Sequence, residues 1–181
     1  MKAWIAVLLL AITLPVTASA TRQVDIGNSA GTLTGSASGL SVSDSTLTMV
    51  NNLYGTGLIT GDLGTVSFTT AALTSGSVET GGTFGPGGSF TVTGNGTNGV
   101  ADGTIFTGTW TGTVTWTMIT LADGSHNYNL TGVVTGTVFT EYRSYSASGV
   151  TFQLTVNTGT GFFNGSIPLS SGNLNILCHP Y

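Results

Sequence analysis

The chain has 181 residues, of which 40% are hydrophobic, only 6% are charged and 28 are glycine, and its formal net charge is −4. Its three cations cannot neutralise a run of phosphates, which argues against nucleic-acid binding and against attraction to an anionic membrane surface. The apolar fraction is too high for a disordered chain, and the length suits one domain with a buried core.

The N-terminus is typical of a secretory signal peptide. Lys2 precedes an apolar run over residues 3–14, and Ala18–Ser19–Ala20 forms a small-x-small cleavage signature. The run is shorter than the about 20 residues of a membrane-spanning helix. We therefore expect residues 1–20 to be removed and residues 21–181 to form a single all-β domain that is secreted, extracellular or at the cell surface. An uncleaved anchor is the alternative. Removal of Lys2 leaves two cations against seven acids, a net charge of −5.

The chain contains one cysteine, Cys178. An intramolecular disulfide is therefore excluded, which is ordinary for an exported bacterial protein and less so for a secreted eukaryotic domain. A disulfide between two chains remains open.

Short alternating runs separated by Gly, Asn, Asp and Ser recur along the chain, and none has helical periodicity. This spacing predicts an all-β fold, an antiparallel β-sandwich, jelly-roll-like or a partly closed barrel, built from long hairpins. A flexible turn region with Pro86 interrupts the pattern at 81–88. The predicted strands cover residues 31–37, 40–43, 45–50, 57–60, 65–71, 77–83, 89–94, 104–121, 125–140, 149–157 and 162–170.

The strand over 104–121 has the clearest pattern, because every odd residue from Thr107 to Thr117 is threonine. A period of two places the threonines on one face and Trp110 and Trp116 on the other. Burial of an aromatic side chain is a large apolar gain, so we expect both tryptophans to pack in the core. The opposite face would carry hydroxyl groups to water.

The strand over 104–121 is expected to form a hairpin with the strand over 125–140. A three-residue loop, Ala122–Asp123–Gly124, keeps the apolar faces together, whereas a two-residue turn would oppose core and polar positions. The resulting register sets large residues opposite small ones, and bending is expected at Gly108 or Gly112. Its predicted pairs are Trp116–Leu130, Val114–Gly132, Gly112–Val134, Trp110–Gly136 and Gly108–Val138.

A second hairpin is predicted from the alternation over 149–157 and 162–170. After a loop over 158–161, it would set Leu154 against Gly165 and Phe152 against Ile167. The remaining residues, 171–181, are expected to form a loose tail.

Candidate catalytic groups are few. The two histidines, His126 and His179, have no recognisable motif around them, and His126 is interpreted as an exposed turn residue. Three aspartates, Asp62, Asp102 and Asp123, each neighbour a glycine, which is typical of turns. They could in principle ligate calcium or hydrolyse glycosides, but no clustered D-x-D pattern supports calcium. We therefore predict no catalytic residue, no cofactor and no metal site.

The candidate ligand contacts are Tyr142, Arg143 and Tyr145, which lie together in a polar loop. The plainer interpretation of that segment is a connection between strands. The threonine faces allow a second hypothesis, since regular hydroxyl arrays can match ice or polysaccharide lattices. Such arrays need threonines aligned across neighbouring strands, whereas the pattern predicts threonines that run mainly along single strands. We therefore interpret these faces as solvated surface with high β-propensity.

Several segments resemble exported bacterial proteins of the PEP-CTERM type: GDLGTVSFTTAALTSGS (61–77), GGTFGPGGSFTVTGNGTNG (81–99), GTIFTGTWTGTVTW (103–116) and TVNTGTGFFNGS (155–166). The resemblance implies association with the cell surface or with exopolysaccharide, and it assigns no catalytic residues. That class ends in a Pro-Glu-Pro element, an apolar helix and a basic cluster, whereas this sequence stops at Leu177–Cys178–His179–Pro180–Tyr181. Release from the cell or a truncated reading frame are the alternatives to anchoring.

The sequence thus favours a secreted, non-enzymatic β-protein of the bacterial envelope or extracellular matrix with a structural or adhesive role. A carbohydrate-binding module is the first alternative, and a small outer-membrane β-barrel is the second. Expected partners are a polysaccharide or further copies of the chain, because edge strands with few charges are weakly protected against self-association.

Overall fold

A computed structural model of the chain describes residues 22–178, so the predicted signal peptide at 1–20 lies outside the described residues. The described part is built from β-strands joined by turns, as predicted. Its strands are β1 (Arg22–Ser29), β2 (Thr32–Ser36), β3 (Gly39–Asn51), β4 (Leu58–Thr60), β5 (Gly64–Thr70), β6 (Leu73–Ser77), β7 (Gly81–Phe84), β8 (Gly88–Asn95), β9 (Asp102–Trp110), β10 (Val114–Thr120), β11 (His126–Phe139), β12 (Ser144–Asn157), β13 (Ser166–Pro168) and β14 (Ser171–Cys178).

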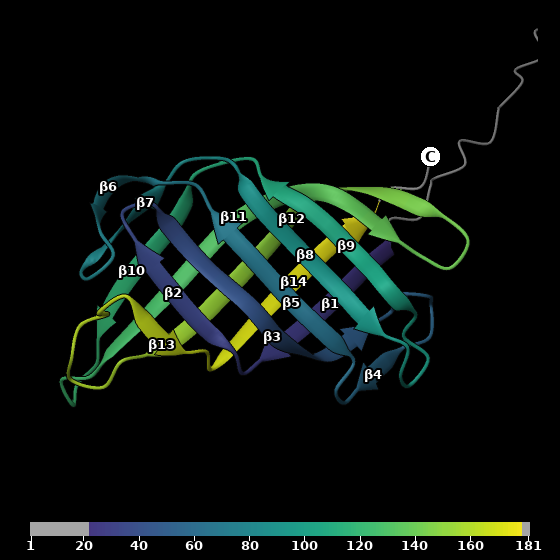
Figure 1. Ribbon diagram of the computed structural model, residues 1–181, viewed down its shortest axis with the longest axis horizontal. Helices are drawn as coiled ribbons and strands as arrows, with labels where there is room; N and C mark the ends of the chain where they lie inside the picture. Colours follow the sequence, from purple (N-terminus) through teal and green to yellow (C-terminus); the bar gives the residue numbers. More distant parts are fainter. Residues whose placement is uncertain (1–21, 179–181) are drawn as a thin grey trace, which may run out of the picture.

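Eight antiparallel strands close into a barrel in the order β12, β14, β1, β3, β5, β8, β9 and β11, because β11 also pairs with β12. The predicted β-sandwich is therefore corrected to a closed barrel. In Figure 1 the strands β3, β5, β8 and β9 of one wall cross the strands β11, β12 and β14 of the other. Outside the barrel, β7 and β6 extend the sheet from β10, β4 and β2 pair with β3, and β13 pairs with β2.

The strand β14 overturns the expectation of a loose tail over 171–181. It lies between β1 and β12 and pairs with both, so that Leu174 stands opposite Ile26 on one side and Phe152 on the other. The side chains of Leu174 and Ile176 are buried. Two buried apolar residues are enough to hold β14 in the sheet because its backbone is hydrogen-bonded along both edges. The last three residues of the predicted tail lie outside the described residues.

The hairpin of β10 and β11 has the predicted loop. Leu121 N donates to Ser125 O at 2.8 Å, which encloses residues 122–124, and Gly124 has a φ of 81° that a side chain would disfavour. Trp116 pairs with Leu130 as predicted. The Ser125 hydroxyl and, after it, the Ser125 backbone N donate to the Asp123 carboxylate, and these two hydrogen bonds lower the pKa of that carboxyl.

The remainder of that register is corrected. The long strand breaks over residues 111–113, so that β9 pairs with β11 while β10 turns away to pair with β7 as well. Trp110 consequently lies opposite Val134 instead of Gly136, and Gly136 lies opposite Gly108. The register shifts by two residues across the break, from the predicted Gly136 to Val134 opposite Trp110, so both tryptophans stay on the inner face. The bend expected at Gly112 falls within this break.

The second predicted hairpin is wrong. Strand β12 pairs with β14, which sets Leu154 opposite Gly172 and Phe152 opposite Leu174. The segment predicted to pair with β12 supplies the short strand β13 instead, whose Ile167 pairs with Leu33 of β2. Closure of the barrel requires a continuous partner along β12, which three residues of β13 could not provide.

The barrel interior is filled by aromatic side chains. Phe68, Phe90, Phe106, Trp110 and Phe152 are fully buried, and Phe90 lies 4.9 Å from Phe152 and 5.9 Å from Trp110 between ring centroids. Most of these ring pairs meet edge to face, an arrangement worth about 1 kcal/mol beyond the area buried. The predicted core positions of both tryptophans are confirmed.

Polar groups in the buried core are paired. The indole of Trp110 donates to Thr69 O at 2.8 Å, and that of Trp116 donates to Val78 O at 2.8 Å. Asn28 is buried and donates to Ser45 Oγ at 2.7 Å. Within residues 22–178, every buried side-chain nitrogen or oxygen has a hydrogen-bond partner. An interior of this kind carries no unsatisfied group that would invite a ligand.

Gly132 tests how tightly the interior is packed. A Cβ atom there would lie 2.7 Å from Trp110 Cζ3 and 3.2 Å from Val114 Cγ2, whereas a Cβ at Gly112 would meet nothing within 4 Å. We expect Gly132→Ala to cost about 1–3 kcal/mol through overpacking. Thermal melting should show a fall of several degrees, and the control Gly112→Ala should stay close to the parent. Equal melting temperatures for the two variants would contradict the packing.

Closure by β14 gives a second prediction. A chain that ends at Ser170 loses the backbone pairing of both β1 and β12, and it should lose cooperative unfolding and the near-ultraviolet circular dichroism of the buried aromatic rings. A chain that ends at Cys178 retains both ladders and should behave like the parent. Cooperative melting of the shorter chain would support the loose-tail interpretation.

Candidate functional site

The predicted contact residues Tyr142, Arg143 and Tyr145 lie at the turn between β11 and β12, which projects past one end of the barrel (Figure 1). The turn is closed by Thr140 N donating to Arg143 O at 2.7 Å, and the Thr140 hydroxyl donates to the same oxygen at 2.9 Å. These bonds hold Tyr142 near the apex, where 84% of the side chain is exposed. A large aromatic group presented to water in this way is available for contact.

The structure brings the three predicted residues together and adds Tyr54. A hollow of about 290 Å³ is lined by Tyr54, Thr140, Glu141, Tyr142, Arg143 and Tyr145, and we call it the tyrosine hollow. Tyr54 and Tyr145 are partly buried and pack against the core, so their rings are held in place, whereas Tyr142 is largely exposed. The sequence pointed to the turn between β11 and β12, but it carried no signal for Tyr54, which the closed barrel places beside that turn.

The charges of the tyrosine hollow are mixed, since Glu141 and Arg143 flank Tyr142. The hydrogen bond of the Tyr142 phenol with the Glu141 carboxylate raises the pKa of that phenol, and the negative charge of Glu141 adds to the effect. The phenol proton is thus engaged with Glu141, and the hydroxyl oxygen remains able to accept a hydrogen bond. A second hollow of about 520 Å³ shares Tyr54 and Glu141 and continues to Thr56, Val100 and Asp102.

The expectation of an exposed turn histidine is wrong for His126, whose side chain is only 9% exposed. Its ring stacks on Phe162 with 5.0 Å between centroids, and its Nδ1 shares a hydrogen bond of 3.1 Å with the Thr120 hydroxyl. His126 thus has a packing role at the barrel end that carries the β10–β11 turn. The other histidine, His179, lies outside the described residues.

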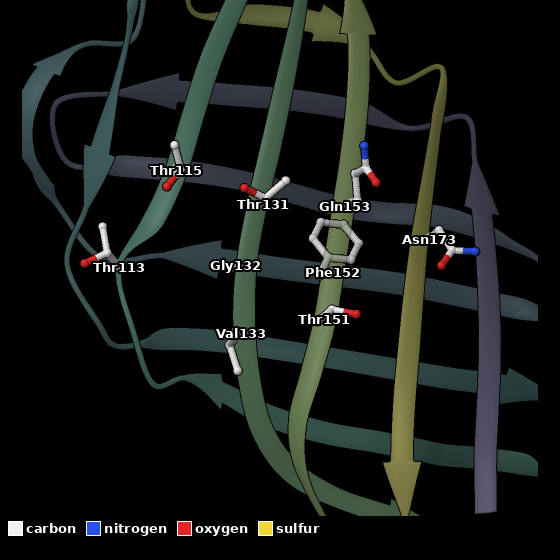
Figure 2. A pocket seen from close by; sticks show the side chains of 9 residues that line it. All are labelled: Thr113, Thr115, Thr131, Gly132, Val133, Thr151, Phe152, Gln153 and Asn173. Carbon is white, nitrogen blue, oxygen red and sulfur yellow. The ribbon is translucent and has the colours of Figure 1, made fainter.

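A shallow hollow of about 400 Å³ lies on the outer face of the sheet, over the barrel strands β11, β12 and β14 and the adjoining strand β10 (Figure 2). Its polar members face outward from four neighbouring strands. Thr115 pairs with Thr131, Thr131 with Gln153, and Gln153 with Asn173. We call Thr115, Thr131, Gln153 and Asn173 the wall row.

The wall row overturns the expectation that hydroxyl groups run mainly along single strands. Nearer the β11–β12 turn, a second row crosses five strands from Ser67 through Thr91, Thr107 and Thr137 to Ser146. The alternation along each strand was visible in the sequence, but alignment between strands depends on the register, which the sequence did not supply beyond one hairpin.

Within residues 22–178, no three His, Cys, Asp or Glu side chains gather as metal ligands would. The same part of the chain holds no helix that is long and apolar enough to cross a membrane. Comparison with known proteins gave no match to any family model, curated protein or solved structure.

The interaction between the Glu141 carboxylate and the Tyr142 phenol can be measured. Replacing Glu141 by Gln removes both the charged acceptor and the negative charge beside the phenol, so the pKa of Tyr142 should fall toward its ordinary value. A titration of the tyrosine side-chain resonances by NMR follows this change. Glu79→Gln, which alters a carboxylate outside the tyrosine hollow, should leave the Tyr142 titration where it was. An unchanged curve for Glu141→Gln would show that the two side chains do not interact.

Proposed function

We propose that the chain is an exported, non-enzymatic β-barrel of the bacterial envelope or extracellular matrix with an adhesive role, and that its tyrosine hollow contacts polysaccharide. One observation carries the proposal: tyrosines from two separate segments, the residues after β3 and the turn before β12, line a single hollow open to water. Tyrosine rings offer an apolar face to the C–H faces of a sugar and a hydroxyl to its alcohols.

The rigidity of two of the rings supports this use. Tyr54 and Tyr145 pack against the core, so ordering them on binding costs little conformational entropy. Tyr142 is largely exposed, so its ring can contact a ligand from the solvent side. Arg143 and Glu141 supply charged donors and acceptors at the rim of the tyrosine hollow, where they can fix the orientation of sugar hydroxyl groups.

Glycoside hydrolysis is the competing function, because Glu141 and Asp102 line one hollow. A retaining or inverting mechanism needs one carboxyl group held protonated, which proteins achieve by burial in an apolar pocket. Both side chains here are exposed. Their setting therefore favours binding without hydrolysis.

The distribution of polarity bears on the membrane-barrel alternative. A barrel in a lipid bilayer turns an apolar band outward. Here the inner positions of β11 and β12 are Leu130, Val134, Phe152 and Leu154, and the outer positions include Thr131 and Gln153. This arrangement favours a barrel surrounded by water. A matrix role through self-association is compatible with it, since within residues 22–178 β6 pairs with no strand other than β7, although Leu73 N donates to Ala37 O at one end of its outer edge.

The proposal predicts that Tyr142→Ala weakens binding to polysaccharide several-fold, because one exposed stacking contact is lost while nothing in the core changes. Tyr145→Ala should weaken it as well, with its melting temperature measured alongside because this ring also packs on the core. Binding is measured on glycan arrays and by pull-down on insoluble cellulose and chitin.

The matched control is Phe162→Ala, which removes another exposed aromatic ring, 56% accessible, away from the tyrosine hollow. It should bind like the parent chain. Equal binding by all three variants would refute the assignment of the tyrosine hollow, and release of reducing sugar from any bound glycan would replace adhesion by hydrolysis.

A further inference from the structure

The wall row differs from its neighbours in how its polar groups are used. In the row on one side, Thr155 donates to Asn129 at 2.9 Å, and in the next row beyond it Asn157 donates to Asn127 at 2.6 Å. In the row on the other side, Asn175 donates to Asp25 at 2.6 Å. The side chains named here form cross-strand hydrogen bonds, which stabilise the sheet.

The four side chains of the wall row make no such bonds. Within the described part of the chain, Thr115, Thr131, Gln153 and Asn173 have no hydrogen-bonded protein partner for their side chains, although each stands directly opposite the next. Figure 2 shows them side by side on adjacent strands over the hollow. Two hydroxyls and two amides are thereby left in a line, with donors and acceptors available to a ligand.

The chemistry of the lining selects the ligand class. No charged residue lines the hollow of about 400 Å³, and its other members are Thr113, Gly132, Val133, Thr151 and Phe152. An ionic ligand would leave its charge uncompensated there, and a protein partner would find no exposed aromatic anchor of the kind that dominates protein interfaces. Uncharged hydroxyls and amides match a ligand that is itself neutral and rich in hydroxyl groups.

The dimensions favour a chain over a single sugar. The four strands are spaced about 4.8 Å apart, so the wall row extends over roughly 14 Å across the strands. Each of these four polar contacts contributes about the free energy of an ordinary hydrogen bond. Useful affinity therefore requires one ligand that engages several of them together.

We propose that the wall row is a second binding site, separate from the tyrosine hollow, for a neutral polysaccharide chain lying across β10, β11, β12 and β14. The polysaccharide hydrogen-bonds to the hydroxyls of Thr115 and Thr131 and to the amides of Gln153 and Asn173. The methyl groups of the threonines and the side chain of Val133, 39% exposed, contact its C–H groups.

The test is amide chemical-shift mapping by NMR with cellohexaose and mannohexaose as probes, on the mature chain. At least one probe should shift the amides of Thr131, Gln153 and Asn173. The double variant Thr131→Val, Gln153→Leu keeps side-chain volume and strand propensity but removes two polar groups, and it should weaken that binding by about ten-fold or more. The matched control is Thr107→Val, an exposed threonine on the opposite wall, which should bind as the parent does.

This experiment tests the wall row and the tyrosine hollow independently. Tyr142→Ala should leave the shifts at the wall row intact, so their persistence supports the second site whatever becomes of the tyrosine hollow. Shifts confined to the residues around Tyr54 and Tyr142, or no shifts with either probe, would overturn the wall site. The wall site is also refuted if the double variant binds like the parent, or if it dissociates a dimer, since the wall would then be an interface between copies.

Discussion

The fold depends on edge-to-face packing of aromatic rings inside a closed barrel. Phe68, Phe90, Trp110 and Phe152 come from four different strands, β5, β8, β9 and β12, and meet at the centre. Rings of this size fit only if the positions beside them are small, which is why Gly132 lies against the indole of Trp110. Glycine here provides space for a neighbour.

A filled interior determines where function can lie. Small ligand-carrying barrels keep a cavity in the lumen, whereas this lumen is occupied by side chains whose polar atoms are already paired within the described residues. The surfaces left for recognition are the barrel ends and the outer wall. The tyrosine hollow lies at one end of the barrel and the wall row lies on its outer face. Both are shallow and open, which suits an extended polymer more than a small enclosed molecule.

Local alternation predicted the all-β content, the core position of Trp110 and Trp116 and the loop at residues 122–124, because each depends on a few neighbouring residues. It was wrong over 77–88, where residues 78–80 form a turn and β7 occupies part of the predicted turn region. It missed β1 and β14, the two strands that complete the barrel, since each offers only a pair of buried aliphatic residues. Tyr142, Arg143 and Tyr145 were found because they are adjacent in sequence. Tyr54 and the wall row were not, because closure and register bring together residues that are far apart in the chain.

The scarcity of charge is explained by the same architecture. The outer positions of the strands carry threonine, serine, asparagine and glutamine, which hydrate the surface and also suit a pleated sheet. Where these groups pair across strands, as in Thr155 with Asn129, they serve the sheet. Where they are left unpaired, as in the wall row, the same residue types become a surface for hydroxylated ligands. Contacts of this kind involve no ion pairs, so salt would screen little of the interaction between the wall row and a neutral ligand.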